Sequence, residues 1–347
     1  MTPAPLITRA AITGPGRIEL EAEPTAPRPG PHDLVIEPDA VGICGTDIEL
    51  FRGTMAYLTS GFAAYPLVPG HEWTGRVIEV GSAVRGFAVG DRVVGECPIG
   101  CGTCERCVAG SYHLCPHRTE TGIARRDGAL ATRLVFPGRA AHRVPDHVAA
   151  TDAALIEPLS VAYRGVQSLG EGIDRPLVVV GGGTIGLLCA LVARAAGNLD
   201  VTVVDAEPSR RDYAASHGFP VHAPDERGRR HPCVIDASGA AGGVSGALAR
   251  CATAGVVVLL GLTGAASTPI DTDGIVLGEL TVRGSLGSVG VWPQVIDLVA
   301  DGRVKPSALV SHEFPLAQAA EAFAMASCHD AGVRKVLIHP ALEGRDG

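Results

Sequence analysis

The chain has 347 residues, of which 46% are hydrophobic and 19% charged, and its formal net charge is −8 at pH 7. This length suits two domains with buried cores, and the hydrophobic content excludes a disordered chain. The acidic balance, without any basic run, argues against a nucleic-acid partner.

The first part of the chain, to about residue 152, contains short β-forming runs that are separated by glycine and proline turns. Examples are HDLVIEPDAVGIC, WTGRVIEVG and GDRVVGE. This pattern predicts an irregular, β-rich domain. The N-terminal stretch, MTPAPLITRAAITGPG, lacks the apolar core of a signal peptide. We therefore expect a soluble, cytoplasmic protein with no membrane partner.

Three segments carry residue types that bind a catalytic metal. VGICGTDIE contains Cys44, VPGHEWTG contains His71 and Glu72, and IEPLSVAYRG contains Glu157. A catalytic zinc takes about three protein ligands of the Cys, His or carboxylate type and keeps one position open. Each residue alone is a weak signal, since a lone His is more often a surface residue. Together, in this order, they predict an open metal site.

Half of the ten cysteines lie within residues 97–115. Four of them follow the spacing C-x2-C-x2-C-x7-C: Cys101, Cys104, Cys107 and Cys115. Two-residue spacers let thiolates converge on one ion at about 2.3 Å, which predicts a closed, structural zinc site. An iron–sulfur cluster is the main alternative, and the long last spacer favours zinc. Cys97 lies outside the regular spacing, so we expect no ligand role for it.

The second half of the chain begins with a dinucleotide-binding pattern. PLVVVGGGTIGLLCALVARAAG predicts an apolar strand, a glycine-rich turn and a helix. The turn has the form G-x-G-x-x-G, and its residues are Gly181, Gly183, Thr184, Ile185 and Gly186. Such glycines let the backbone approach a pyrophosphate, which then lies at the helix N-terminus.

The next β-run, DVTVVD, ends in Asp205. A carboxylate about 20 residues beyond the glycine motif accepts hydrogen bonds from a ribose diol and repels a 2′-phosphate. Arg210 and Arg211 lie close by in the sequence and would instead suit a 2′-phosphate. We favour NAD. Further β-runs at CVIDASG, VVVLLGL and LTVRGSLG, with helix-compatible segments between them, predict a doubly wound parallel sheet of the α/β class.

These motifs together resemble the zinc-dependent medium-chain dehydrogenase/reductases of the alcohol dehydrogenase superfamily, over essentially the whole chain. The resemblance rests on CGTD, GHE, GDRVVGE, the four-cysteine loop, EPLSVA and GGGTIG. EPLSVA carries Glu157 where other branches have Cys, which is similar to the polyol and sugar branch. That branch includes sorbitol, glucose and aminocyclitol dehydrogenases.

The resemblance implies a GroES-like catalytic domain over residues 1–152 and an NAD-binding Rossmann domain over residues 153–289. Residues 290–347 are then expected to return to the catalytic domain. The active site is expected in the cleft between the domains. The resemblance also implies a homo-oligomer, either a dimer or a tetramer.

The resemblance further implies a catalytic zinc held by Cys44, His71 and Glu157. Glu72 either ligates the metal directly, replaces a departing water or lies behind the ligands, and the sequence leaves these alternatives open. Thr46 corresponds to the hydroxyl that takes the proton of the alcohol. Many relatives have a His three residues later, whereas this chain has Glu49. Either Glu49 relays the proton or the proton leaves by another route.

Two residues are predicted to contact the substrate. Trp73 follows the metal-binding pair directly, and its ring could stack on a sugar or cyclitol; packing inside the β-rich domain is the alternative. Glu120 resembles an acidic residue that contacts substrate in glucose dehydrogenases; a simply solvated carboxylate is the alternative.

The sequence as a whole predicts an NAD-dependent enzyme with two zinc ions per chain. Its substrate is expected to be a secondary alcohol on a sugar, polyol or aminocyclitol. Threonine dehydrogenases share both zinc sites, but they usually lack EPLSVA. Zinc-free quinone and enoyl reductases lack the cysteine loop. A zinc-braced, NAD-binding sensor without activity would be expected to have lost some of the catalytic ligands.

Overall fold

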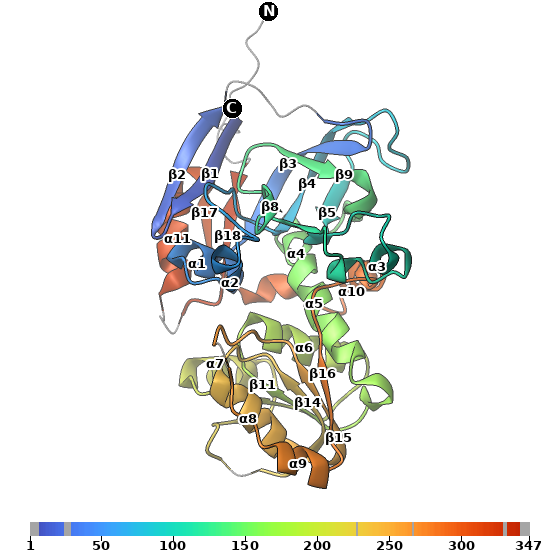
Figure 1. Ribbon diagram of the computed structural model, residues 1–347, viewed down its shortest axis with the longest axis vertical. Helices are drawn as coiled ribbons and strands as arrows, with labels where there is room; N and C mark the ends of the chain where they lie inside the picture. Colours follow the sequence, from blue (N-terminus) through green and yellow to red (C-terminus); the bar gives the residue numbers. More distant parts are fainter. Residues whose placement is uncertain (1–6, 24–28, 227, 266, 329–331, 341–347) are drawn as a thin grey trace, which may run out of the picture. The chain divides into compact units, whose positions relative to one another are not determined.

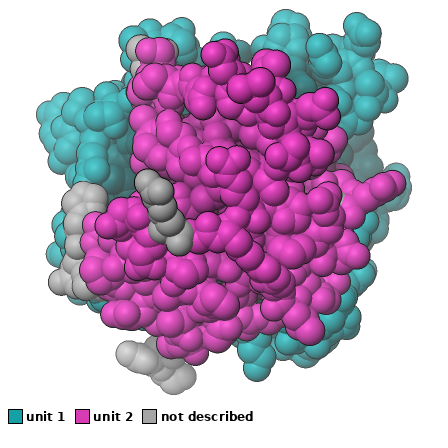
Figure 2. Space-filling view, turned by 90° about the horizontal axis from the view of Figure 1, so that it is seen from below, with its two compact units in different colours: residues 1–157, 292–347 teal, residues 158–291 magenta. Residues whose placement is uncertain are grey.

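The computed structural model describes residues 7–23, 29–226, 228–265, 267–328 and 332–340. The chain forms two compact units, which Figure 2 colours separately: unit 1 is Met1–Glu157 with Trp292–Gly347, and unit 2 is Pro158–Val291. The sequence analysis placed the boundaries after residues 152 and 289, whereas the units meet after residues 157 and 291.

The main sheet of unit 1 has seven strands in the order β10-β5-β4-β3-β18-β17, with β9 also paired to β3. Their bounds are β3 (Asp33–Gly42), β4 (Glu72–Val80), β5 (Arg92–Gly95), β9 (Leu134–Pro137), β10 (Ala141–Arg143), β17 (Val310–Pro315) and β18 (Lys335–His339). The late strand β18 runs antiparallel to β3, with Leu337 opposite Gly42. The last part of the chain therefore completes a sheet that the first part begins (Figure 1).

Smaller elements surround this sheet. β1 (Ile7–Gly14) and β2 (Arg17–Glu23) form a hairpin, and β6 (Pro98–Ile99), β7 (Thr119–Thr121) and β8 (Arg125–Arg126) form a three-stranded sheet. The helices are α1 (Gly45–Arg52), α2 (Ala56–Thr59), α3 (Glu105–Val108), α4 (Ala150–Ala154), α10 (Trp292–Ala300) and α11 (Ala319–Ser327). One core holds the unit together, and its fully buried large side chains include Ile36, Trp73, Phe136 and Phe323.

Unit 2 is built on six strands in the order β13-β12-β11-β14-β15-β16, and every neighbouring pair is parallel. The strands are β11 (Leu177–Val180), β12 (Val201–Val204), β13 (Val221–His222), β14 (His231–Asp236), β15 (Cys251–Leu259) and β16 (Thr281–Gly284). The helices are α6 (Thr184–Ala195), α7 (Pro208–Ser216), α8 (Ala241–Arg250) and α9 (Thr272–Leu277), while α5 (Ile156–Gln167) begins in unit 1.

The strand order of unit 2 reverses at β11, from which the chain first builds outward to β12 and β13 and then crosses to β14. Ligands of such sheets bind outside the carboxyl ends of the strands at this reversal. All residues of β11 and β12 are buried, as expected for strands covered on both faces. The predicted combination of an irregular β-rich domain and a doubly wound parallel sheet is confirmed.

Within the described residues, no helix has the length and apolar character that crossing a membrane requires.

Candidate metal centres and dinucleotide site

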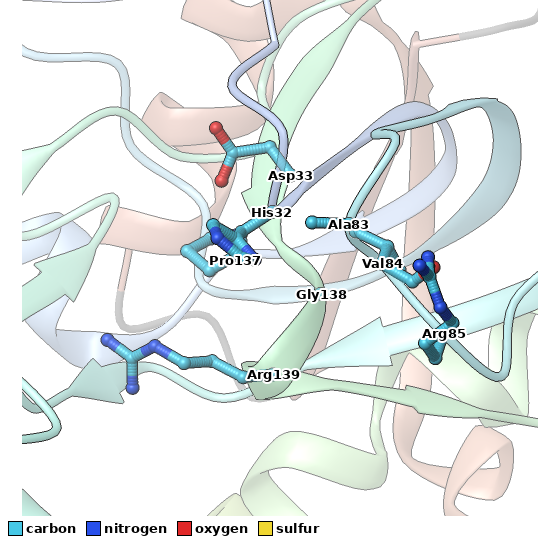
Figure 3. A pocket seen from close by; sticks show the side chains of 8 residues that line it. All are labelled: His32, Asp33, Ala83, Val84, Arg85, Pro137, Gly138 and Arg139. Carbon is cyan, nitrogen blue, oxygen red and sulfur yellow. The ribbon is translucent and has the colours of Figure 1, made fainter.

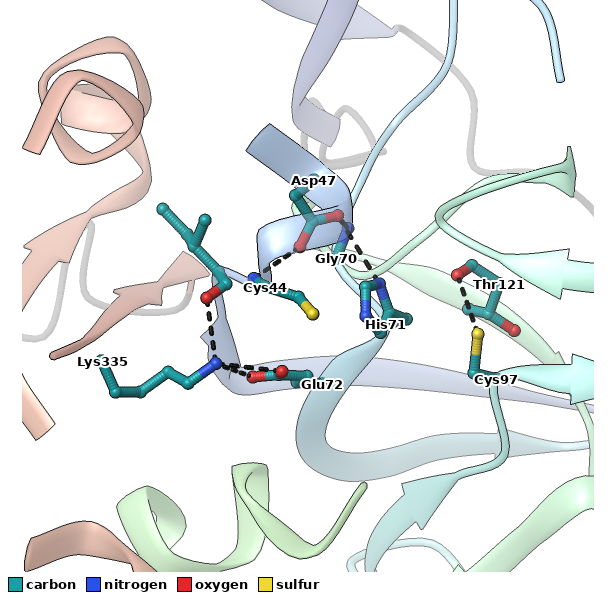
Figure 4. Close-up of polar contacts among 9 residues, drawn as sticks. Cys44, Asp47, Gly70, His71, Glu72, Cys97, Thr121 and Lys335 are labelled. Atoms are coloured by element: carbon teal, nitrogen blue, oxygen red, sulfur yellow. Dashed lines mark hydrogen bonds and ion pairs between the residues drawn. The ribbon is translucent and has the colours of Figure 1, made fainter. Parts of the chain in front are cut away.

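Two adjacent strands bring three predicted metal ligands together. β3 leads directly to Cys44, which precedes helix α1, and β4 begins at Glu72, opposite Gly42. The ligand atoms of Cys44, His71 and Glu72 all lie within 4.8 Å of one another (Figure 4). A Cβ on Gly42 would lie 2.3 Å from Oε2 of Glu72, so only glycine leaves room for this carboxylate. The backbone pairing thus builds the cluster.

Asp47 orients two of these ligands. Its Oδ2 accepts a 2.8 Å hydrogen bond from the backbone N–H of Cys44, and its Oδ1 lies 3.5 Å from Nδ1 of His71. The sequence analysis gave Asp47 no role. Its position three residues after Cys44, in the first turn of α1, is the signal that could have revealed it, because such a carboxylate caps the helix start.

The imidazole of His71 is buried beside these acidic groups. Burial alone would lower its pKa, but the Asp47 carboxylate and the Cys44 thiol raise the pKa of His71 well above its usual value. Nδ1 is buried and has no hydrogen-bond partner within the described residues, although it faces Asp47. Because Nδ1 faces the carboxylate, Nε2 is the nitrogen available to a metal. A thiol, an imidazole and a carboxylate in one buried cluster fit zinc.

Glu72 is held by a lysine that the sequence analysis did not single out. Nζ of Lys335, on β18, donates hydrogen bonds of 3.0 and 2.7 Å to the two oxygens of Glu72. It donates a third, of 3.0 Å, to the carbonyl of Ile43. Glu72 is 1% exposed and Lys335 is 3% exposed. A lysine inside the apolar run VRKVLIH is the signal that could have indicated a buried, paired cation.

Glu157 lies near this cluster but outside its compact part. It is buried at the start of α5, and burial raises its pKa to about 7, with His71, Glu72 and Lys335 also acting on it. The group of atoms within 4.8 Å contains Glu72 and not Glu157. Glu72 therefore lies closer to Cys44 and His71 than Glu157 does, and Glu157 stays a predicted ligand.

The four predicted thiols of the cysteine loop converge. The sulfurs of Cys101, Cys104, Cys107 and Cys115 all lie within 4.8 Å of one another. The Sγ–Sγ distances are 3.9 Å from Cys101 to Cys107 and 3.6 Å from Cys104 to Cys115. Four sulfurs placed tetrahedrally at about 2.3 Å from one zinc would be about 3.8 Å apart. The loop therefore fits a closed zinc site.

The four thiols differ in acidity: backbone hydrogen bonds favour the thiolate at Cys101, whereas burial raises the pKa of Cys107 to about 11. The N–H of Cys104 donates to Sγ of Cys101 at 3.4 Å, and the N–H of His117 donates to Sγ of Cys115 at 3.3 Å. Hydrogen bonds from the backbone and the hydroxyl of Thr103 lower the pKa of Cys101 to about 5. Thiolates are the form that binds a metal.

Cys97 stays outside the four-thiol group, as expected. It is nonetheless placed beside the other cluster (Figure 4). Burial raises its pKa well above the usual value, and the charges of His71 and Glu157 act on it as well. Its Sγ lies 3.9 Å from the carbonyl of Thr121.

The predicted stacking role of Trp73 is wrong. Trp73 is 1% exposed and packs edge-on against Phe136, with ring centroids 5.0 Å apart. Adjacent residues of a strand point to opposite faces, so Trp73 lies on the core side of β4 when Glu72 lies on the metal side. The alternative, packing inside the β-rich domain, applies.

Glu120 is buried and already paired. Its Oε1 accepts a 2.7 Å hydrogen bond from Nε of Arg118 and lies 3.4 Å from the hydroxyl of Tyr57. In the pairing of β6 with β7, Glu120 lies opposite Pro98, next to Cys97, and Figure 4 draws Cys97 beside the metal cluster. Within the described residues, Oε2 of Glu120 makes no hydrogen bond and stays available to a ligand.

Thr46 and Glu49 lie on α1, directly after Cys44. Both are partly exposed. Burial raises the pKa of Glu49. This geometry gives Glu49 an accessible carboxylate on the helix that follows the metal ligand.

In unit 2 the glycine turn connects β11 to α6. Gly183 is the N-cap of α6 and has no side chain that could cap the free N–H groups of the first turn, which include those of Thr184 and Ile185. A Cβ on Gly186 would lie 1.7 Å from the carbonyl oxygen of Gly181, so this close approach of helix and turn requires glycine. The free N–H groups and the close backbone fit a pyrophosphate.

Asp205 lies beside this turn, at the end of β12. Its Oδ2 accepts a 2.6 Å hydrogen bond from the N–H of Gly182, and its Oδ1 accepts one of 2.8 Å from the N–H of Glu207. Nη1 of Arg210 lies 3.7 Å from Oδ2 of Asp205, and Arg211 donates to the carbonyls of Asp205 and Ala206. The carboxylate of Asp205 therefore lies against the glycine turn, between the N–H groups of Gly182 and Glu207.

Unit 1 also contains a cavity of about 570 Å³ (Figure 3). It is lined by His32, Asp33, Ala83, Val84, Arg85, Pro137, Gly138 and Arg139. None of the predicted site residues lines it, and the sequence motifs assign it no role.

Comparison with known proteins agrees with both sites. The alcohol dehydrogenase GroES-like domain family matches residues 30–146, and the zinc-binding dehydrogenase family matches residues 184–301. Sorbitol dehydrogenase of Ovis aries is 31% identical over 326 residues, covering 90% of this chain and 91% of the relative. A probable D-xylulose reductase A of Neosartorya fischeri is 33% identical over 331 residues, covering 90% and 91%.

The chain belongs to the zinc-dependent medium-chain dehydrogenase/reductases. Within this family it falls in the branch that contains the sorbitol dehydrogenases. A crystal structure from Sinorhizobium meliloti, described as a zinc-binding dehydrogenase bound to NADP, is similar to the whole chain. Its TM-score is 0.89 at 30% identity, and the match covers 97% of this chain and 100% of that one.

Proposed function

We propose that the protein transfers a hydride between a secondary alcohol of a polyhydroxylated compound and NAD. The observation that carries this proposal is the cluster of Cys44, His71 and Glu72 in a chain that also holds a dinucleotide turn and a closed four-thiol loop. The names of its relatives, sorbitol dehydrogenase and D-xylulose reductase, support a polyol or sugar as substrate.

In this proposal Cys44 and His71 hold the catalytic zinc together with Glu72, and Glu157 lies within reach as a further carboxylate. Bound there, zinc supplies Lewis acidity that lowers the pKa of an alcohol. Asp47 keeps the His71 ring oriented. The hydroxyl of Thr46 would accept the proton of the alcohol while it passes its own proton on, and the carboxylate of Glu49 would receive that proton and release it to solvent.

Glu120 is proposed to recognise substrate hydroxyls. Its free Oε2 can accept a hydrogen bond, while the Arg118 guanidinium and the Tyr57 hydroxyl hold its other oxygen. Arg118 already balances the charge of Glu120. A positively charged amino group of a substrate would therefore be attracted less strongly by Glu120 than by an unpaired carboxylate.

A substrate panel tests the proposed function. Sugars, polyols, aminocyclitols, threonine and ethanol are each incubated with the enzyme and NAD, and NADH is followed by its absorbance. A polyol, sugar or aminocyclitol should be oxidised with the highest kcat/KM, and ethanol should be far poorer. If threonine or ethanol exceeds every polyhydroxylated compound, the substrate assignment is wrong and the chain is a threonine or general alcohol dehydrogenase.

Asp205 is expected to determine the preference for NAD over NADP. Its carboxylate lies where a ribose diol would bind, and it would repel a 2′-phosphate. Hydrogen bonds to charged groups contribute about 1.5–3 kcal/mol, so Asp205→Ser should reduce kcat/KM for NAD by about 10- to 100-fold. Asp212→Ser changes an exposed residue of α7; it is the control and should leave kcat/KM for NAD unchanged. A wild-type preference for NADP would mean that Arg210 dominates instead.

Glu49 is expected to produce an acidic limb in the pH–rate profile. A proton acceptor must be ionised, and burial raises the pKa of Glu49. The rate should therefore rise as the pH increases through this raised pKa and fall below it, where the carboxyl is protonated. Glu49→Gln should remove that limb and lower kcat, whereas Glu79→Gln, at an exposed position of β4, should not. An unchanged profile in Glu49→Gln excludes it from proton transfer.

We also propose that the protein is a homo-oligomer, joined through the edge of the sheet in unit 2. All four residues of the edge strand β16 are exposed, and Val276 and Leu277 just before it are 74% and 83% exposed. Exposed, apolar edge strands pair with further strands. Light scattering should find a dimer or tetramer, and Val282→Lys should shift it toward the monomer. A monomeric wild-type protein contradicts this assembly.

We place the protein in the cytoplasm. No disulfide joins the cysteines of the described residues, and four clustered thiols without a disulfide are typical of a reducing compartment. Fractionation of the producing cells should recover the protein with the cytoplasmic enzymes; recovery from the medium would contradict this location.

A further inference from the structure

The buried pair of Lys335 and Glu72 has a feature that the proposed reaction does not use. Nζ of Lys335 contacts both oxygens of Glu72, at 3.0 and 2.7 Å, so no oxygen of this carboxylate is free of the lysine (Figure 4). Metal-binding carboxylates are commonly hydrogen-bonded by residues behind them, but here the partner is a full positive charge in contact with both oxygens. The third N–H of the ammonium group donates a hydrogen bond to the carbonyl of Ile43, which precedes Cys44 in the chain.

The lysine enters the cluster from a distant part of the chain. Lys335 begins β18, which pairs with β3 just before Cys44, so the sheet places the ammonium group beside the ligands. The side chains of Lys335 and Glu72 are 4% and 1% exposed. Little water reaches the pair, and its mutual attraction is correspondingly strong.

The charges in the cluster give this pair a specific consequence. Cys44, Asp47, Glu72 and Glu157 supply acidic groups, and Lys335 is the fixed cation that acts on Cys44, Asp47 and Glu72 alike. An ammonium group in contact with both oxygens partly neutralises the carboxylate and lowers its attraction for a second cation. The strength of Glu72 as a metal ligand therefore depends on Lys335.

We propose that Lys335 is a positioning residue of the catalytic site: by holding both oxygens of Glu72, it weakens this carboxylate as a zinc ligand. The inference rests on the proposed function only in assuming that zinc binds at this cluster. If Glu72 binds the zinc only weakly, Cys44 and His71 are the strong ligands, and substrate can take the position that Glu72 leaves open. Loss of the lysine charge would let Glu72 bind the metal fully.

The rate of metal release tests this proposal without using turnover. A chromophoric chelator is added to the zinc-loaded enzyme, and the phase that is missing in His71→Ala identifies the catalytic ion. Lys335→Gln removes the charge and keeps a donor for Glu72, while Lys335→Arg keeps the charge. Loss of a residue behind a metal ligand usually lowers metal affinity by about 10- to 100-fold. Lys335 is instead a cation that competes with the metal for Glu72, so we expect a change of about that size in the opposite direction. Release should slow about tenfold or more in Lys335→Gln and change little in Lys335→Arg.

A double variant tests whether the effect of Lys335 on metal release acts through Glu72. In Glu72→Gln, the additional change Lys335→Gln should no longer slow release, because the carboxylate that gains strength is absent. Glu72→Gln alone should change the release rate by less than about threefold, since Lys335 already weakens this ligand. This single variant keeps the proposal testable even if Lys335→Gln does not fold.

Cobalt substitution gives an independent readout. The visible spectrum of Co²⁺ at the catalytic site should change in Lys335→Gln, because Glu72 then binds the metal more strongly, and should be unchanged in Lys335→Arg. Three results would overturn the proposal: unchanged or faster release in Lys335→Gln, slowed release that persists without Glu72, or tenfold faster release in Glu72→Gln alone. A wild-type enzyme without any His71-dependent phase would overturn the catalytic metal site itself, and this inference with it.

Discussion

Cys104→Ser is expected to release the structural zinc and to unfold the protein at temperatures where the wild type is folded. The four sulfurs lie at the spacing of a zinc tetrahedron, and the loop around them has little apolar support, with Val108 78% exposed. Structural zinc contributes about 10–16 kcal/mol in small zinc-binding peptides, which is comparable with the whole stability of a domain. Elemental analysis should find one zinc per chain in place of two, and circular dichroism should record a lower Tm.

Cys97→Ser is the matched control for this variant. Cys97 belongs to the same segment but lies outside the four-thiol group, so both ions should remain. Retention of two zinc ions in Cys104→Ser would contradict the assignment of that thiol as a ligand. Iron with a visible chromophore in the wild type would contradict zinc and indicate an iron–sulfur cluster.

His71→Ala should abolish turnover while the fold and the structural zinc remain. Removing the imidazole takes a ligand from the compact cluster and leaves Asp47 without the ring that it faces. Lewis-acid stabilisation contributes several kcal/mol, and a tenfold change in rate corresponds to about 1.4 kcal/mol, so kcat/KM should fall by at least about 10³-fold. The measurement pairs kcat/KM on the best substrate with zinc content and Tm.

The exposed His32→Ala serves as control and should behave as the wild type. Activity of His71→Ala within tenfold of the wild type would show that the metal of this cluster is not part of the reaction.

The local motifs could be predicted from the sequence because each one lies within a short segment. The four thiols lie within a segment of fifteen residues, from Cys101 to Cys115, so their spacing alone brings them together. The glycine turn likewise requires only a strand followed by a helix, and the structure has this arrangement at β11 and α6. The alternating pattern of unit 2 predicted its parallel sheet for the same reason.

The contacts of the catalytic cluster could not be predicted in this way. Lys335 meets Glu72 across 263 positions of sequence, and only the pairing of β18 with β3 brings them together. The position of Trp73 could have been deduced, because neighbours on a strand face opposite sides and Glu72 faces the metal. The choice between Glu72 and Glu157 in the compact group depends on side-chain distances that no motif encodes.

The most direct test of the central claim follows the hydride itself. The polyhydroxylated substrate that the enzyme oxidises fastest is labelled with deuterium at the carbon that bears the reacting hydroxyl. It is then incubated with the zinc-loaded enzyme and NAD, and the reduced cofactor is examined by mass spectrometry. The account predicts NADH that is heavier by one deuterium, with the ketone as the other product. Reduced cofactor without deuterium, or no reduction of NAD by any polyhydroxylated compound, would contradict it.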